Sequence, residues 1–386
     1  MTQITEAIDV APRPAPPPYG VAQEAADRYY TASQFQLMWW KFKKHRLALI
    51  GSAILGVFVF IAVFAEFLSP YTPTARTPDY LFGRPQVLHF VDAEGKFHLR
   101  PFTYALTAAM DPKTFLLEVK EDTTEPWPVY FWVKGDAYKM WGLIKSDRHL
   151  FGVTEGHLHI LGTDQLGRDL LSRLFYATRT SLTIGVVGLF ISFFLGLIIG
   201  GISGFFGGGI DDAIQRFIEF IRSIPTLPLW MAMAAALPKE WSPQRVYFTI
   251  TILLGLLGWT HLARRVRGKL LSLREEDFVV AARIAGSSDA RIIARHLLPS
   301  FLSYIIVDLS ISFPYMILAE TSLSFIGLGL RAPVISWGVL LQNAQNIQAI
   351  ALYPWLFTPV AFVIISVMAF SFVGDGMRDA ADPYSR

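Results

Sequence analysis

Residues 181–203 read "SLTIGVVGLFISFFLGLIIGGIS", a run without a single acidic or basic side chain. An α-helix needs about 20 apolar residues to cross the ~30 Å hydrocarbon core of a bilayer, and this run is long enough. Its glycines at 196, 200 and 201, with Gly204 and 207–209 beyond, suit close helix packing and then a turn. The stretch therefore predicts a membrane-spanning helix that lies tightly against a neighbour.

The composition of the whole chain agrees with this. Of 386 residues, 53% are hydrophobic and 17% charged, and the mean hydropathy is +0.40. A soluble domain usually has about 25% charged residues, so the chain is predicted to be a polytopic membrane protein. The net charge of +3 is too small to indicate a nucleic-acid partner. The lack of cysteine excludes disulfides, zinc–thiolate sites and thiol catalysis.

Five further apolar runs are long enough to span a membrane, and they lie at 47–65, 217–237, 246–263, 302–323 and 354–374. The run at 217–237 contains Pro225 and Pro228, which predict a kink. We therefore expect an all-α polytopic protein with six transmembrane helices and with both termini on one side.

The short basic segments indicate the orientation. The flank before the first span carries Lys41, Lys43, Lys44 and Arg46, and the loop at 264–299 carries eight lysines and arginines (Arg264, Arg265, Arg267, Lys269, Arg274, Arg283, Arg291 and Arg295). The short loops predicted on the other side hold only Lys239, Arg245 and Arg331. By the positive-inside rule, both termini and the 264–299 loop are expected to be cytoplasmic.

Four regions follow from these patterns. Residues 1–46 combine the Pro-rich "APRPAPPPYG", expected to be disordered, with "FQLMWWKFKKHRLAL". The latter is either an interfacial amphipathic helix or the basic flank of the first span. Residues 47–67 hold the first span, 68–177 an extracytoplasmic lobe, and 178–386 a core with five spans.

The 68–177 lobe is predicted to contain short strands, because "EPWPVYFWVKGDAYKMWGLI" (125–144) is rich in aromatic and β-branched residues. His157 and His159 alternate with Leu158 and Ile160, so both imidazoles are expected on one strand face, with His149 nearby. A metal site is conceivable there, but solvated histidines are the more common outcome, and we predict no metal.

Recognisable catalytic motifs are missing from the sequence. It contains no G-x-x-x-x-G-K-[ST] phosphate loop, no H-E-x-x-H and no G-x-S-x-G. We therefore expect no enzyme. If the chain moves a substrate uphill, the energy comes from another subunit or from an ion gradient.

Residues 278–300, "FVVAARIAGSSDARIIARHLLPS", are predicted to form an amphipathic helix broken at Gly286. Ser287 or Ser288 suits the N-cap of the second part, and Asp289 suits its first turn. Arg291 and Arg295 form a basic stripe beside an apolar one. Such a helix either lies on an anionic lipid surface or docks into a groove of a partner protein.

This stretch resembles the E-A-A-x-x-x-G loop of ABC importer permeases, which ends in a hydrophobic-Leu-Pro sequence. Ala281, Ala282, Gly286, Leu298 and Pro299 match the pattern, whereas Val280 stands where the family has glutamate. Four other stretches resemble the C-type permease of dipeptide and oligopeptide importers: "LGTDQLGRDLLSRLFYATRTSL" (161–182), "AETSLSFIGLG" (319–329), "SWG" (336–338) and "VGDGMRDAADP" (373–383). The resemblance covers 161–386 and the first span, and it does not extend to the insertion at 68–160.

The resemblance implies the MetI-like fold of type I ABC importer permeases, with six transmembrane helices and here a small β-containing insertion. It implies a bacterial inner-membrane heterodimer with a homologous B-type permease, two cytoplasmic ATPase subunits and an extracytoplasmic peptide-binding protein. ATP and Mg would bind only in the ATPase subunits, whose closure would move the 281–297 helix and rock the spans from inward-open to outward-open. The implied substrate is a peptide, and the alternatives are a nickel chelate, glutathione or a peptide antibiotic.

The residues expected to couple the spans to the ATPase are Ala281, Ala282, Gly286, Asp289, Arg291, Ile292 and Arg295. Asp308 lies deep in the fifth span, where a lipid-facing charge would cost several kcal/mol. It is expected either in the translocation pathway or, more commonly for such a residue, in a helix–helix contact. Glu320 is expected at the membrane interface.

Two further expectations concern the outer side of the membrane, and a third concerns secondary transporters as an alternative class of protein. Residues 162–169, "GTDQLGRD", are expected to form an amphipathic piece near a docking surface, or else internal salt bridges of Asp164, Arg168 and Asp169. The insertion is expected to widen that docking surface. An ion-coupled secondary transporter would also lack a phosphate loop, but inverted repeats and several buried ionisable groups are expected of it, and the sequence reveals neither.

Overall fold

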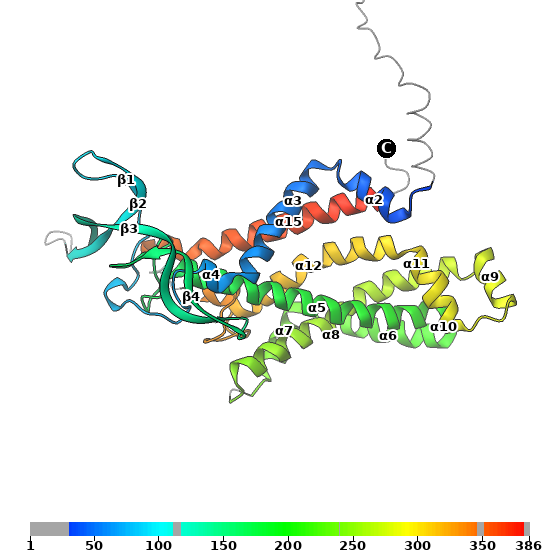
Figure 1. Cartoon of the computed structure of the whole chain (residues 1–386). Helices are drawn as coiled ribbons and strands as arrows, with labels where there is room; N and C mark the ends of the chain where they lie inside the picture. Colours follow the sequence, from blue (N-terminus) through cyan, green and yellow to red (C-terminus); the bar gives the residue numbers. More distant parts are fainter. Residues whose placement is uncertain (1–30, 111–116, 239, 346–350, 382–386) are drawn as a thin grey trace, which may run out of the picture.

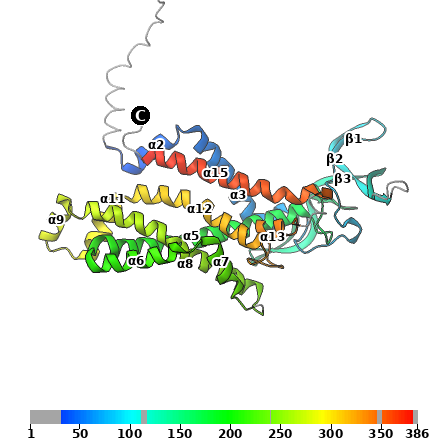
Figure 2. The same ribbon diagram turned by 180° about the vertical axis from the view of Figure 1, so that it is seen from behind.

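The computed structural model describes residues 31–110, 117–238, 240–345 and 351–381, so the Pro-rich segment expected to be disordered lies outside the described residues. The described chain is an elongated bundle of helices with a β lobe at one end (Figures 1 and 2). The labels α9 and α11 lie at the opposite end of the bundle in both views, with α10 beside them in Figure 1. Two candidate interaction regions therefore lie at opposite ends of the long axis.

Five of the described helices are long and apolar enough to cross a membrane. They are α3 (Arg46–Val63), α5 (Leu170–Phe206), α8 (Pro243–Leu273), α12 (Leu302–Phe325) and α15 (Thr358–Ala381), the last preceded by the short helix η3 (Pro354–Phe357). They overlap five of the six apolar runs in the sequence. A polytopic helical fold is thus confirmed.

The remaining run, 217–237, is broken rather than kinked. Helix α6 (Gly208–Ser223) is amphipathic, and Ile224 is extended with φ −89° and ψ 128°. Helix α7 (Thr226–Ala235) is apolar but has only 10 residues, which span about 15 Å. Pro225 explains the break, since its ring disfavours a helical conformation at the preceding residue and it has no N–H to donate. Among the described residues, five helices are therefore long enough to span a membrane and one apolar helix is short, where the sequence predicts six spans.

Helices α5 and α8 pack through a seam of glycines. A Cβ atom on Gly200 would lie 2.5 Å from the carbonyl oxygen of Ala263, and one on Gly204 would lie 2.7 Å from that of Arg267. A Cβ atom on Gly196 would lie 2.8 Å from the side chain of Leu262. The expected close packing is confirmed at these positions, and Gly207 and Gly208, both with positive φ, form the turn into α6.

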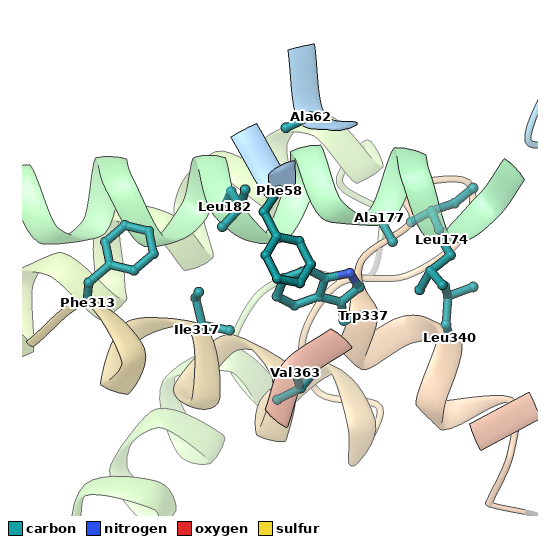
Figure 3. Close-up of a cluster of buried hydrophobic side chains, with 11 residues drawn as sticks. Phe58, Ala62, Leu174, Ala177, Leu182, Phe313, Ile317, Trp337, Leu340 and Val363 are labelled. Carbon is teal, nitrogen blue, oxygen red and sulfur yellow. The ribbon is translucent and has the colours of Figure 1, made fainter. Parts of the chain in front are cut away.

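Trp337 lies at the centre of the largest buried cluster, where α3, α5, α12 and α15 meet (Figure 3). Ser336 caps the short helix α13 (Trp337–Gln342) by accepting from the Val339 N–H. The Trp337 N–H donates to Ser181 Oγ at 3.2 Å, and its indole donates to Thr178 Oγ1 at 3.3 Å. The "SWG" stretch therefore ties the α12–α15 connection to α5.

The lobe is a four-stranded antiparallel sheet in the order β1-β2-β3-β4. Its strands are β1 (His89–Val91), β2 (Phe97–Met110), β3 (Leu117–Met140) and β4 (Ile144–Val153). The β insertion is confirmed, but β3 is 24 residues long rather than short. Register shifts after Tyr104 and after Lys134 let the long strands bend. The short helices α4 (Ala65–Leu68) and η1 (Pro78–Tyr80) lie between α3 and the sheet.

Residues 162–169 join the lobe to α5 through buried charges. Asp169 caps α5 by accepting from the Ser172 N–H at 2.7 Å and lies 3.1 Å from His159 Nδ1. Asp164 forms ion pairs with Arg168 and with Arg173, both poorly exposed. Of the internal salt bridges expected as the second alternative, the one between Asp164 and Arg168 is present, whereas Asp169 pairs with His159 outside this non-helical segment.

The histidines do not share a strand face, because β4 ends at Val153. The rings of His157 and His159 nevertheless lie side by side, with centroids 6.0 Å apart, and His159 and His149 are buried rather than solvated. Burial and the neighbouring His159 hold the pKa of His157 below its usual value. No group of three metal-ligating side chains occurs within the described ranges.

Near the N-terminus, α2 (Gln34–Phe42) starts at a capping box formed by Ser33 and Gln36. Phe42 is buried beside Ala48 and Ala380, whereas Trp39 and Trp40 are exposed. A separate amphipathic helix beside the C-terminal end of α15 favours the interpretation of this segment as an interfacial helix.

Candidate coupling site

The 264–299 loop begins as the last turns of α8 and then folds into four short pieces. These are α9 (Asp277–Ile284), α10 (Asp289–Arg291), the π-helical turn η2 (Ile292–Leu297) and α11 (Leu298–Ser300). They form the end of the bundle opposite the β lobe (Figure 1).

Gly286 ends α9, as the sequence predicts. Its φ of +77° lies in the left-handed region that favours glycine. The Gly286 N–H donates to the Arg283 carbonyl at 3.0 Å, and the Ser287 N–H donates to the Ala282 carbonyl at 3.1 Å. This pair of bonds is a Schellman motif, which satisfies carbonyls that the end of a helix leaves free. Ser288 then occupies the N-cap position of α10, without a side-chain cap.

One face of the segment belongs to the protein core. Val279, Ile292 and Leu297 are fully buried in a cluster with Leu270 of α8 and Phe205 of α5. Ile292, one of the expected coupling residues, therefore cannot contact a partner directly in this conformation. Its packing instead fixes the segment to the spanning helices.

The opposite face is open. Ala281, Asp289, Arg291 and Arg295 are exposed and Ala282 is half-buried. Between them lies an apolar patch that sequence reasoning missed, formed by Val280 and by Ile284, which is 83% exposed. The signal is in "FVVAARIA" (278–285), where Val280 and Ile284 are four residues apart and so share a face of the helix that is turned away from the buried Val279. A helix that is apolar on both faces is normally covered on both.

The π-helical turn at Ile292–Leu297 is a second feature that the sequence did not reveal. The Leu298 N–H donates to the Ile293 carbonyl, five residues back. Pro299 follows, and its missing N–H and bulky ring account for the wider turn. The turn presents Arg295 on the outside while Leu297 stays in the core.

Three ion pairs link the C-terminal part of α8 to neighbouring helices. Arg267 donates to both oxygens of Asp211 at 2.5 Å, and Arg264 lies 3.5 Å from Glu219 on the same helix, α6. Arg265 pairs with Asp308 on α12. Hydrogen bonds from Arg267 hold the pKa of Asp211 below its usual value. In the sequence these arginines indicate only the orientation, and their acidic partners lie on other helices.

Asp308 and Glu320 are both buried in α12. The ion pair of Asp308 with Arg265 is a helix–helix contact, the more common of the two expected roles. Glu320, expected at the membrane interface, is fully buried within the protein. Its carboxylate accepts from Ser181 at 3.2 Å and from Ser324 at 2.8 Å, so hydroxyl groups on α5 and α12 account for its burial.

Comparison with known proteins gives the family. Residues 192–386 match the family described as binding-protein-dependent transport system inner membrane component, and residues 33–85 match the N-terminal TM domain of oligopeptide transport permease C. The dipeptide transport system permease protein DppC of Lactococcus lactis is 31% identical over 354 residues, covering 91% of each chain. The oligopeptide transport system permease protein OppC of Bacillus subtilis is 37% identical over 229 residues, covering 59% of this chain and 72% of its own.

Among solved structures, an inward-facing conformation of the MetNI methionine ABC transporter is similar with a TM-score of 0.43 and 20% identity. That match covers 54% of this chain and 96% of the other. The family match covers half of the present chain, and the Lactococcus relative covers nearly all of it. The chain is an integral membrane protein that belongs to the binding-protein-dependent inner-membrane permeases of ABC importers, in the C-type branch of the oligopeptide and dipeptide permeases.

Proposed function

We propose that this chain is a membrane-spanning subunit of an ATP-driven peptide importer and forms half of the translocation pathway. The other half would come from a homologous B-type permease. The family match and the oligopeptide and dipeptide permeases among its relatives support this proposal. Nickel chelates, glutathione and peptide antibiotics are the alternative cargoes.

The chain itself is not an enzyme in this proposal. Its sequence has no phosphate loop, so ATP and Mg would bind in two separate cytoplasmic ATPase subunits, and an extracytoplasmic binding protein would deliver the peptide. The basic flank of α3 and the basic 264–299 loop support a bacterial inner-membrane location with both termini in the cytoplasm. The position of α9 and the β lobe at opposite ends supports the same orientation (Figure 2).

The observation that carries the coupling role is the exposed apolar patch of α9. Ile284 is 83% exposed in a helix whose other face is in the core. We assign this patch, with Ala281, Ala282, Asp289, Arg291 and Arg295 around it, to the ATPase contact. Movement of α9 would pass through Val279 and Ile292 to α8 and α5, because these side chains share one cluster.

Val280 fits this assignment. It occupies the position that the family resemblance gives to glutamate, and it is exposed next to the Ile284 face. An apolar residue there extends the patch by one side chain and removes a charge from it. The partner groove is accordingly expected to be more apolar at this point than that of a relative with glutamate.

The test replaces Ile284 with glutamate, with Leu99→Glu as the matched control. Leu99 is 90% exposed on β2, so both substitutions add one charge to an exposed leucine-sized position. We expect Ile284→Glu to abolish co-purification of the ATPase subunits and ATP-dependent peptide uptake in proteoliposomes, and Leu99→Glu to preserve both. Normal assembly and uptake with Ile284→Glu would refute the coupling assignment.

An ion-coupled transporter is the competing class. Buried acids such as Asp308 and Glu320 give it some support, but Arg265 and serine hydroxyls partner them. The same proteoliposomes discriminate the two classes. Uptake driven by an imposed ion gradient without ATP would favour the ion-coupled reading.

A further inference from the structure

The tip of the β3–β4 hairpin, "KMWGLIK" at residues 139–145, has an unusual surface for a water-exposed turn. Trp141 and Gly142 both have positive φ, and the Leu143 N–H closes the turn by donating to the Met140 carbonyl at 3.0 Å. Trp141 is 55% exposed, Leu143 84% and Ile144 64%. The turn thus displays three large apolar side chains together.

Hydrogen bonds hold this tip at the end of a membrane span. The Trp141 indole N–H donates to the carbonyl of Val63, the last residue of α3, at 3.0 Å. The Trp141 backbone N–H donates to Glu66 at 3.3 Å, and the Arg179 guanidinium of α5 lies over the indole ring at 4.4 Å. The 18 residues of α3 are about 27 Å long, which matches the ~30 Å hydrocarbon core. Val63, and the tip bonded to it, therefore lie at the membrane boundary.

The apolar surface of α3 continues into the lobe. Val59 and Phe60 are exposed on α3. The centroids of the Phe60 and Phe64 rings are 4.9 Å apart. Beyond the end of α3, the ring of Phe67 packs against the exposed Trp132 of β3, with ring centroids 5.0 Å apart. Aromatic side chains at this level are typical of the belt in which membrane proteins meet the lipid headgroups.

Two lysines flank the tip and face the same side of the hairpin. Lys139 and Lys145 are direct cross-strand partners, a like-charge pairing that is unfavourable in a sheet. In the described part of the chain neither lysine has an ion-pair partner, and residues 139–145 contain no acid. A shallow groove of ≈ 450 Å³ lies between them, and Asp147 at its edge is 3.6 Å from Lys134. An anion bound between the lysines would relieve their repulsion.

We propose that this hairpin tip is a membrane anchor of the lobe. Trp141, Leu143 and Ile144 enter the headgroup region of the leaflet next to the end of α3, and Lys139 and Lys145 bind the phosphates of anionic lipids. The anchor fixes the sheet against the bilayer surface beside the first span. It does not depend on which substrate the protein carries or on which side of the membrane the lobe lies.

The absence of cysteine makes a direct test simple. Leu143→Cys and Leu99→Cys are each labelled with a nitroxide in the full-length protein, purified with its co-assembling subunits. The samples are placed in nanodiscs of phosphatidylcholine, with and without phosphatidylglycerol, and collisions with oxygen and with a water-soluble nickel chelate are measured. We expect the label at position 143 to have a severalfold higher oxygen-to-nickel ratio than the label at 99.

The lysines are tested on the Leu143→Cys background. Lys139→Gln with Lys145→Gln should lower the ratio at position 143 in discs that contain phosphatidylglycerol and leave it unchanged in phosphatidylcholine alone. A ratio at 143 equal to that at 99 would overturn the proposal. So would a label at 143 shielded from both reagents, since that result would mean that another protein subunit covers the tip. An insertion insensitive to phosphatidylglycerol would overturn the phosphate-binding part.

Discussion

Gly286 has a φ of +77°, and a Cβ atom added there would meet nothing within 4 Å. The backbone, and not the available space, therefore restricts this position. We predict that Gly286→Val destabilises the end of α9 by about 1–2 kcal/mol, the usual cost of a left-handed conformation. Gly286→Asn is the matched control, because asparagine tolerates this region. Peptide uptake should fall clearly with valine and be largely retained with asparagine; equal losses would show that side-chain size is decisive.

Asp211 gives a pH-dependent prediction. Arg267 holds the folded-state pKa of Asp211 below the ordinary value of about 3.9. The ion pair therefore stabilises the fold fully above that pH, and this stabilisation is lost as the pH falls through the lower, folded-state pKa. The melting temperature of Asp211→Asn in detergent should lie below that of the unchanged protein at pH 6 to 8, and the gap should close under acid conditions, below roughly pH 4. A gap that is independent of pH would mean that packing, not charge, is lost.

At this scale the sequence predicts some residues well and others poorly. The break at Gly286 follows from a local preference of glycine, so the sequence suffices. The burial of Ile292 and Glu320 depends on helices far away in the chain, as does the pairing of Arg265 with Asp308. No local pattern distinguishes an arginine that marks the cytoplasmic side from one that binds an acid on a neighbouring helix.

Among the helices, the α5–α8 seam allows a matched pair of substitutions. Gly200 and Gly201 are neighbours, but a Cβ on Gly200 would lie 2.5 Å from the Ala263 carbonyl oxygen, whereas one on Gly201 meets open space. Gly200→Ala should destabilise the protein by about 1–3 kcal/mol, as overpacking usually does. Gly201→Ala should be neutral or stabilising, by at most ~1 kcal/mol. Thermal unfolding in detergent measures both, and equal effects would contradict the assigned helix contact.

The lengths of the elements show where the sequence is informative. Apolar runs predict α3, α5, α8, α12 and α15 because a bilayer requires a minimum span. The break between α6 and α7 and the π-helical turn before Pro299 are harder to predict, since proline can kink, break or widen a helix according to its neighbours. The long β3 strand escaped prediction because its bend comes from register shifts set by β2 and β4.

For the whole molecule, the two ends of the bundle should be reachable from opposite sides of the membrane. Leu99 on β2 and Ile284 on α9 are both highly exposed and lie at these two ends. In the cysteine-free chain, Leu99→Cys should react with a membrane-impermeant maleimide in spheroplasts, and Ile284→Cys should react only in inverted vesicles from cells that lack the ATPase subunits, which are proposed to cover this position. Labelling of both variants from one side would refute the proposed topology.

The length of helix α5 has a mechanical consequence for the lobe. This helix has 37 residues without a break, about 55 Å of rod. Its first turn is clamped to the lobe by Asp164 and Asp169, and near its other end Phe205 packs in the cluster that holds α9. A rod held at both ends behaves as a lever, so any tilt produced at one membrane surface must appear at the other. A tilt of α5 produced at its α9 end would therefore also move the base of the lobe.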